Sequence, residues 1–468
     1  MKTDDKKLGL LGLVAIIITS MIGGGMFNIP SDMARHSGIA AVAIGWLITG
    51  IGMVCLGLVF QHLSANRPEL DGGVYSYARA GFGKLMGFSS AWGYWVSAFL
   101  GNVAYVLILF DTLSYFFPIL ENPLYEFIGS SIIIWGLYFI VYSGIKEAAI
   151  INTVTTFAKL IPLLIFIVIM CFFCNIENLK LDFWGDGIPN SLFEQIKETM
   201  LVTVWVFLGV EGAIVISSRA KNKKAVGHAT IIGLFFTMFL YIIVTFITLA
   251  AIPREVVVAM PNPSLAYALE FLIGKCGAII VSIGLIISIV GSLLGWTILA
   301  IEVPYIAAKD KVMPEIFLKE NKNETPSFSL LFTTISVHIF IALSMLFSET
   351  YQSIYIIASA AILLPYLLSA LYDLKVVLCG KSKNNKFIFK DFCIASIASI
   401  YAVWLLYTAA EHLLSCSILY AIGICLFIIG KPKEQEKFTK MEWFIASAIL
   451  IVACVSIVLM LQNSPSLT

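Results

Sequence analysis

Five ionisable side chains fall inside long apolar stretches of this sequence, where a charge needs a specific reason to be present. They are Asp111, Lys159, Glu211, Glu302 and His338. A charged side chain at the centre of a bilayer costs at least about 2.5–3.5 kcal/mol, so such groups are functional candidates by default. Glu211, flanked by Gly209 and Gly212, is the first candidate for a proton-linked or gating carboxylate, with a structural ion pair as the alternative. We expect His338 to be a packing residue and leave the role of Glu302 open.

These residues form no pattern that would support catalysis or bind a metal. A membrane-embedded enzyme would need a nucleophile with its base or a metal cluster, and no His/Asp/Glu group has suitable spacing. The closest cysteine pair, Cys171 and Cys174, has no second pair or histidine nearby. We therefore expect no enzymatic activity, no metal and no cofactor. A channel stays open as an alternative, and it would need polar residues lining a pore.

The composition places these groups in a membrane protein. Of 468 residues, 59% are hydrophobic and 13% charged, the mean hydropathy is +0.94 and the net charge is +1. Lys and Arg separate apolar runs and form no single basic face, so no nucleic-acid partner is expected. A membrane helix needs roughly 20 apolar residues. On that criterion thirteen segments qualify: 8–34, 39–62, 87–117, 125–144, 148–174, 196–217, 228–252, 276–307, 328–347, 352–378, 391–410, 413–430 and 441–461.

The distribution of basic residues predicts the orientation. With the N-terminus inside, 24 of the 30 Lys and Arg residues fall on the inner side, where such residues are retained. We expect one transmembrane domain over 1–468, with repeats at about 8–174 and 196–378 and accessory helices at about 391–461. Segment 63–86 is expected to be an inner loop with a short amphipathic helix that starts at Asp71, Gly72 and Gly73.

The first apolar segment contains a break. Gly23, Gly24 and Gly25 follow Ile22, and each glycine disfavours helix by about 1 kcal/mol relative to Ala. Backbone freed from a helix inside a membrane must line a cavity or a ligand site. A glycine patch for close helix packing is the alternative.

The sixth apolar segment carries the counterpart, in which Gly209 and Gly212 flank Glu211. This segment opens a second group of five, and an odd-numbered repeat is inserted upside down relative to the first. Paired breaks in inverted halves indicate a substrate site at mid-membrane. Freed amides and a helix N-terminus would attract a carboxylate, and freed carbonyls would accept from an ammonium, so an amino acid fits.

Other residues could select the side chain of such a substrate. Trp296 lies among small neighbours, and an indole face attracts a desolvated guanidinium by about 1–2 kcal/mol. Tyr94 and Asn102 share one helix stripe, and Trp205 precedes the second break by less than two turns. Lys159 could fill the volume that sodium-coupled relatives give to an ion. Packing, interhelical hydrogen bonding and snorkelling are the plainer alternatives for these residues.

Several motifs together resemble the amino acid–polyamine–organocation superfamily. They are IGGGMFNIP at 22–30, RPELDGGVYSYAR at 67–79 and GVEG at 209–212. Within it, WGYW at 92–95, LGNVAY at 100–105, GWT at 295–297 and EVPY at 302–305 are similar to basic amino acid/polyamine antiporters. The similarity covers about 8–430 and points to arginine/ornithine antiporters first, with arginine/agmatine exchangers next.

The resemblance implies an all-α polytopic membrane protein with a five-plus-five inverted repeat, in which helices 1 and 6 are unwound at mid-membrane. It implies substrate-binding residues Ile22, Gly23, Gly24, Gly25, Tyr94, Asn102, Trp205, Gly209 and Trp296, with Glu211 and Lys159 in proton coupling or gating. Two positions depart from an arginine/agmatine exchanger. Gly24 stands where that exchanger carries a serine. Lys159 occupies a position that is apolar in that exchanger but basic in proton-coupled and some exchanging relatives, which keeps proton coupling open.

The expected function is antiport of arginine or lysine for ornithine or agmatine across the inner membrane, with a proton-coupled symporter as the alternative. The expected partners are cationic amino acids or their decarboxylation products, and membrane lipid. The oligomeric state stays open, with a homodimer among the alternatives. The thirteenth segment exceeds the usual twelve.

Overall fold

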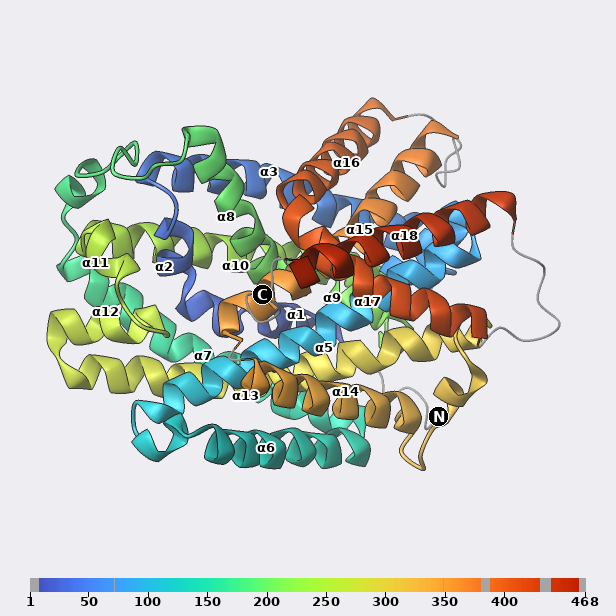
Figure 1. Ribbon diagram of the computed structural model, residues 1–468, viewed down its shortest axis with the longest axis horizontal. Helices are drawn as coiled ribbons and strands as arrows, with labels where there is room; N and C mark the ends of the chain where they lie inside the picture. Colours follow the sequence, from blue (N-terminus) through green and yellow to red (C-terminus); the bar gives the residue numbers. More distant parts are fainter. Residues whose placement is uncertain (1–7, 71, 348, 380–387, 430–438, 463–468) are drawn as a thin grey trace.

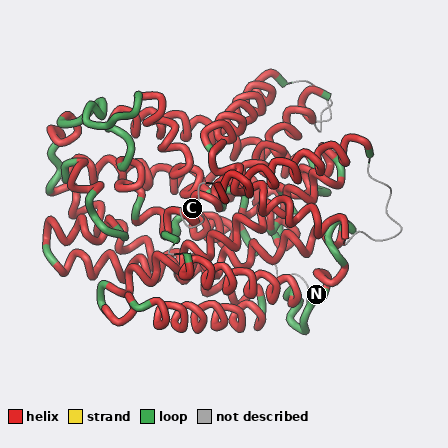
Figure 2. Tube along the Cα trace, in the orientation of Figure 1, coloured by secondary structure: helices red, strands yellow, loops and turns green. Residues whose placement is uncertain are grey.

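The computed structural model describes residues 8–70, 72–347, 349–379, 388–429 and 439–462. In this part of the chain all regular secondary structure is helical, apart from two isolated bridges (Figure 2). The long helices lie side by side and run from one end of the molecule to the other (Figure 1). Asp71 lies outside the described residues.

Eleven helices in the described ranges are long and apolar enough to cross a membrane. They are α3 (Ile39–Asn66), α5 (Lys84–Ser114), α6 (Pro123–Ser143), α7 (Ile145–Phe172), α10 (Lys223–Ala251), α13 (Lys275–Lys309), α14 (Ser327–Leu346), α15 (Tyr351–Leu378), α16 (Phe389–Thr408), α17 (Ala410–Ile429) and α18 (Lys440–Gln462). With the two broken helices, they account for the thirteen predicted segments.

The two predicted breaks are present. The first segment consists of α1 (Leu10–Met21), a 3₁₀ turn η1 (Gly24–Phe27) and α2 (Ile29–Ala34). The sixth consists of α8 (Leu192–Phe207) and the short α9 (Gly212–Val215), with four non-helical residues between them. Gly209 there has φ +103°, a left-handed conformation that favours glycine. Helices 1 and 6 are therefore interrupted, as the sequence predicts.

The connecting segments contain further short elements. The predicted amphipathic helix is α4 (Val74–Phe82), which begins directly after Gly73. Two helices between α10 and α13 were not predicted: α11 (Arg254–Val258) and α12 (Ser264–Ile273). Both are too short for a membrane-length criterion, and both follow a proline. The remaining 3₁₀ turns are η2 (Pro118–Glu121), η3 (Ile176–Lys180), η4 (Ser217–Arg219) and η5 (Glu315–Leu318).

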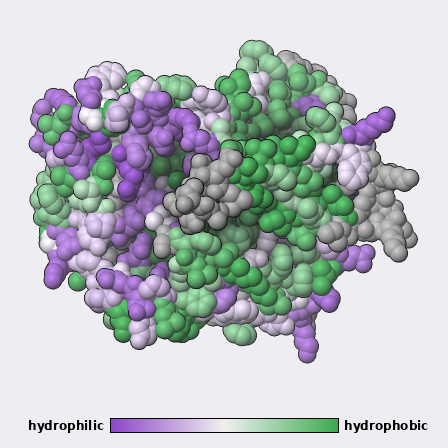
Figure 3. Space-filling view, viewed as in Figure 1, coloured by the Kyte–Doolittle hydropathy of each residue, from purple (hydrophilic) through white to green (hydrophobic). Residues whose placement is uncertain are grey.

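Helix α5 is the centre of the bundle. In its most apolar stretch of 18 residues, 89% is buried inside the protein. Helix α5 packs against α13 and α15. By contrast, only 17% of the equivalent 18-residue stretch of α18 is buried, and α18 packs mainly on α17. Figure 3 shows apolar residues covering the face over α17 and α18, while hydrophilic residues gather towards α2 and α11. An apolar outer face is expected where lipid replaces water.

The break in the sixth segment predicts a specific cost for a methyl group at Gly209. Gly209→Ala should lower stability by roughly 1–3 kcal/mol, because a non-glycine residue is strained at this φ and its Cβ would lie 2.5 Å from Cβ of Ser20. Thermal unfolding of the purified protein measures this. Gly136→Ala is the control, since nothing lies within 4 Å of its Cβ in α6; equal effects of both substitutions would contradict the prediction.

Candidate functional site

The two breaks contact each other in the middle of the bundle. The Ser20 hydroxyl, in the last turn of α1, bonds the carbonyls of Ile16 at 2.6 Å and Gly209 at 3.3 Å. Gly209 approaches so closely that a side chain would collide with Ser20. The unwound backbone of both helices therefore meets at one place, which is the arrangement that a site between inverted repeats requires.

The carbonyls freed at the end of α1 are satisfied by two neighbouring helices. Lys159 Nζ on α7 donates to Thr19 O at 3.2 Å and Ile22 O at 2.5 Å. From α13, Ser288 donates to Ile22 O at 3.0 Å, and Ser292 donates to Thr19 O at 3.0 Å. All three donors are buried. Freed backbone groups in a membrane need such partners, so Lys159 and the two serines hold the unwound end of α1 in place.

Trp296 lies against the same break. Its indole Nε1 donates to Ser20 O at 2.9 Å, and its ring centroid is 6.3 Å from that of Tyr94 on α5. Asn102, also on α5, donates to Thr297 Oγ1 at 3.3 Å, and its own Oδ1 is buried with no partner among the described residues. Trp296 thus contacts the end of α1 directly, while Tyr94 and Asn102 on α5 lie next to Trp296 and Thr297.

The glycine triplet allows aromatic side chains to approach the backbone. A Cβ at Gly25 would lie 2.7 Å from the Trp205 ring, and one at Gly24 would lie 2.9 Å from Ile108. A Cβ at Gly23 would collide with the Tyr105 hydroxyl. The Tyr105 and Trp205 rings pack together at 5.3 Å. In this conformation, the two aromatic rings therefore cover the glycines of η1.

Glu211 is fully buried at the start of α9. Its Oε2 accepts from the Tyr366 hydroxyl of α15 at 2.6 Å. Oε1 and the buried Tyr94 hydroxyl of α5 have no hydrogen-bond partner among the described residues. The carboxyl group therefore joins the second break to α15 through Tyr366.

A cavity of about 540 Å³ leads from one end of the bundle towards Trp205. Tyr351 lines this cavity, and its hydroxyl accepts from Trp205 Nε1 at 2.8 Å. The Trp205 ring also stacks on Tyr355 at 5.3 Å. Three carboxylates, Asp111, Glu126 and Glu349, line the walls. We call this cavity the acidic vestibule; Trp205 and Tyr351 separate it from the breaks.

The opposite end of the bundle is closed by an ion pair. Arg219 in η4 donates to Glu302 Oε2 on α13, with Nη2 at 2.9 Å and Nε at 3.0 Å. The backbone of Arg219 and Lys221 also pairs with Leu8, just before α1, at 2.8 and 2.9 Å. Glu302, whose role the sequence leaves open, therefore pairs with Arg219. The Lys309 ammonium lies over the Tyr305 ring at 4.2 Å.

The structure brings most of the sequence-derived candidates together. Ile22, Gly23, Gly24, Gly25, Trp205, Gly209, Trp296 and Lys159 all contact one of the breaks or a residue of it. Tyr94 and Asn102 contact Trp296 and Thr297 of α13, and Glu211 lies at the start of α9. Among the other ionisable candidates, Asp111 is exposed in the vestibule, and His338 packs against Phe127 and Trp135.

Three residues at the site were missed from the sequence. Ser288 and Ser292 precede Trp296 at intervals of four residues, so all three lie on one stripe of α13. The four-residue spacing is visible in the sequence and indicates that both serines share a helix face with Trp296. Tyr105 lies three residues after Asn102 on α5, and its contact with Gly23 could only be learned from how the helices pack.

Comparison with known proteins now decides the family. Residues 8–411 match the amino acid permease family. The chain belongs to this family. The match ends near the start of α17, but an arginine/ornithine antiporter of Pseudomonas aeruginosa is 44% identical over 97% of both chains. An arginine/agmatine antiporter of Chlamydia pneumoniae is 39% identical over 94% of both chains. The superfamily resemblance seen in the sequence is thus confirmed.

A solved structure supports the fold of this permease. The crystal structure of MhsT in complex with L-phenylalanine superposes with a TM-score of 0.60, covering 86% of this chain and 98% of that one. At 16% sequence identity the likeness concerns the fold alone. It agrees with the predicted inverted-repeat architecture with two broken helices, in a multi-pass membrane protein.

The contacts of Lys159 predict that its ammonium stabilises the unwound end of α1. Lys159→Met should lower the stability of this permease by roughly 1–3 kcal/mol, because buried carbonyls lose a donor. Thermal unfolding in detergent measures the change. Ser288→Ala should have a smaller effect, since Ser288 donates to Ile22 O alone, whereas Lys159 donates to both Thr19 O and Ile22 O. An unchanged melting temperature for Lys159→Met would refute the role.

Proposed function

We propose that this permease exchanges cationic amino acids, taking up arginine or lysine and releasing ornithine or agmatine, by alternating access and without covalent chemistry. The observation that carries the proposal is the meeting of the two breaks with Trp296 hydrogen-bonded to one of them. The full-length similarity to an arginine/ornithine and an arginine/agmatine antiporter supports the same substrate class.

In this proposal the unwound backbone binds the amino acid head group. The amides of Gly23, Gly24 and Gly25 would bind the carboxylate, since glycine lets a ligand approach the backbone closely. The carbonyls at the second break, near Gly209, would accept from the α-ammonium. The free Oδ1 of Asn102 would take a further head-group hydrogen bond. For this to happen, Tyr105 and Trp205 must withdraw from the glycines.

Trp296 would select the cationic side chain. A guanidinium stacked on a desolvated indole gains about 2 kcal/mol, and no carboxylate at the site is then needed to hold the charge. The acidic vestibule would raise the local concentration of cations on their way in, because carboxylates lining a cleft attract positive charge. Its carboxylates Asp111, Glu126 and Glu349 are on the route to Tyr351.

Transport would follow from gates on both sides of the site. Trp205 and Tyr94 would act as aromatic gates, and Glu211 would respond to pH through its bond to Tyr366. Exchange results when substrate favours the occluded state and the empty carrier reorients slowly. The Arg219–Glu302 pair would be the barrier that opens when the other end closes.

The orientation and assembly belong to the same proposal. We place the chain in the cell inner membrane with the N-terminus cytoplasmic, so that the acidic vestibule faces outwards and Arg219 inwards, in line with the distribution of basic residues. We treat 1–468 as one domain with repeats at about 8–174 and 196–378 and accessory helices after 391. A lipid bilayer surrounds it, and a homodimer is compatible with the exposed apolar faces.

Counterflow in liposomes tests the proposal. Vesicles containing the purified protein should take up labelled arginine when loaded with unlabelled arginine, ornithine or agmatine, and should take up little when empty, because the unloaded carrier returns slowly. Protein-free vesicles are the control. Uptake into empty vesicles that depends on a pH gradient would instead favour a proton-coupled symporter.

That second candidate is kept because of Lys159. Its ammonium is buried against Thr19 O and Ile22 O, so gain or loss of a proton there would alter the end of α1. The two functions differ in the pH dependence of net uptake, which the same vesicles measure.

Trp296 supplies a separate prediction about specificity. Trp296→Leu should weaken arginine binding by roughly 5- to 30-fold, which corresponds to about 1–2 kcal/mol of lost cation–π attraction. Isothermal calorimetry on the purified variants measures it. Trp184→Leu is the control, since this indole is exposed in the connection between α7 and α8. Unaltered arginine affinity in Trp296→Leu would show that the indole does not stack on the substrate.

A further inference from the structure

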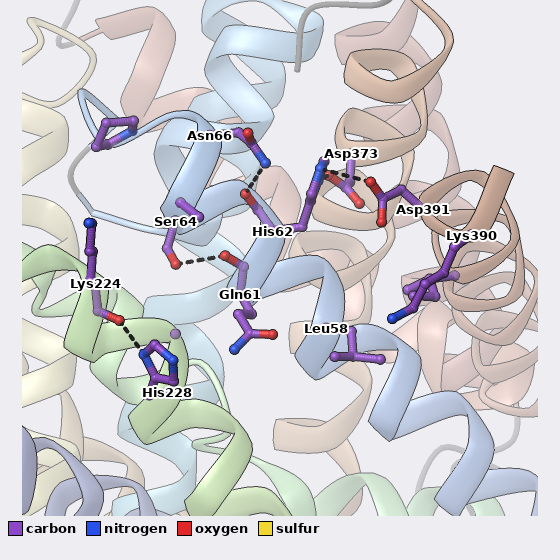
Figure 4. A pocket seen from close by; sticks show the side chains of 14 residues that line it. Leu58, Gln61, His62, Ser64, Asn66, Lys224, His228, Asp373, Lys390 and Asp391 are labelled. Carbon is purple, nitrogen blue, oxygen red and sulfur yellow. Dashed lines mark hydrogen bonds and ion pairs between the residues drawn. The ribbon is translucent and has the colours of Figure 1, made fainter. Parts of the chain in front are cut away.

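A second cavity, of about 570 Å³, lies away from the breaks at the end of the bundle that carries Arg219. Its lining comes from four membrane helices: Gln61 and His62 from α3, Lys224 and His228 from α10, Asp373 from α15, and Lys390 from α16. Figure 4 shows Lys224 and Lys390 on opposite sides of the α3 side chains. None of these residues takes part in the site described above.

The cavity carries two ammonium groups that are available to a ligand. Lys224 and Lys390 are exposed, and neither ammonium has a hydrogen bond or ion pair within the ranges that the structure describes. His228 is also exposed, and its Nδ1 bonds Lys224 O at 2.9 Å, which leaves Nε2 free to face the cavity. Two lysines and amide or imidazole groups around one hollow suit an anion with several oxygens.

The two carboxylates of the lining both face the imidazole of His62. His62 Nδ1 is 2.6 Å from Asp373 Oδ1, and His62 Nε2 is 3.6 Å from Asp391 Oδ2. Figure 4 shows the His62 ring close to both acids. These contacts join α3 to α15 and α16 and do not involve the two lysines.

Apolar side chains continue from the cavity along the membrane. On α3, Leu58 lines the cavity, and Ile51 and Leu47 follow on the same face at intervals of seven and four residues. On α10, Ile232, Phe235 and Phe239 lie four, seven and eleven residues beyond His228. On α16, Ile394 lines the cavity and Ile397 lies one turn further. Apart from the cavity-lining Leu58 and Ile394, these side chains are 40–64% exposed.

Both α10 and α16 pack on α3, so the exposed apolar side chains of the three helices lie next to one another. This apolar surface begins at the cavity and runs along the helices towards the middle of the bilayer. A ligand that fits both parts must have an anionic end and a long apolar end. An anionic phospholipid of the bilayer has this chemistry, and juxtamembrane lysines attract such headgroups.

We propose that this cavity is a binding site for an anionic phospholipid, with the anionic headgroup in the cavity that Lys224 and Lys390 line and the acyl chains lying on the apolar faces of α3, α10 and α16. The site joins α10, which directly follows the second broken helix, to the accessory helix α16. Bound lipid therefore links the transport bundle to a helix outside the two repeats. This proposal concerns binding alone and stands or falls independently of the transported substrate.

Lipid binding to the detergent-purified full-length protein tests the proposal. Native mass spectrometry with phosphatidylglycerol should show bound lipid at lower concentration than with phosphatidylcholine of the same chain length. The double variant Lys224→Gln/Lys390→Gln should weaken phosphatidylglycerol binding by roughly 25-fold, at about fivefold for each lysine near an anionic lipid surface. The control is Lys319→Gln/Lys322→Gln, which removes the same charge from exposed positions between α13 and α14.

Each alternative occupant has a distinct outcome. Equal loss of affinity in the control variant would mean that net charge, not this cavity, binds the lipid, and the proposal would be wrong. Glycerol 3-phosphate or inorganic phosphate that protects the protein from thermal unfolding as well as phosphatidylglycerol would indicate a soluble anion, and would also overturn it. A melting temperature of the double variant equal to that of the parent, with weakened binding, is the expected result.

Discussion

The structure depends on how main-chain carbonyls are satisfied where a membrane helix stops. At the end of α1, the carbonyls of Thr19 and Ile22 are freed in the interior of the bundle, where an unsatisfied buried carbonyl costs several kcal/mol. Lys159, Ser288 and Ser292 donate to them from two different helices. The break is thus a built feature, held open by α7 and α13, and the rest of the site is arranged around it.

This constraint explains why the most polar residues of the core are where they are. Ser20 connects the first break to the second, and Trp296 bonds the carbonyl of Ser20. Glu211 begins the short helix after the second break and accepts from Tyr366. Ser20 and Trp296 thus donate to main-chain carbonyls that a continuous helix would have bonded to its own amides.

Much of this architecture could be predicted from sequence, because its signals are local. The membrane helices are visible as thirteen apolar segments. The two breaks are visible as three consecutive glycines and as a glycine pair around Glu211, and each of these signals depends only on residues that are neighbours in the sequence. Helices α11 and α12 were not predicted, because they are short and follow Pro253 and Pro263. The pairing of Glu302 with Arg219, and the approach of Tyr105 to Gly23, depend on which helices become neighbours. Such contacts join residues far apart in sequence, and no spacing rule reaches them.

The backbone pairing of Leu8 with Arg219 and Lys221 has a mechanical consequence. It fastens the start of the first broken helix to the end of the sixth, and Arg219 is in turn anchored to α13. These bonds join both broken helices at the end of the bundle that carries Arg219. Displacing one of them therefore either breaks these bonds or draws the other helix along.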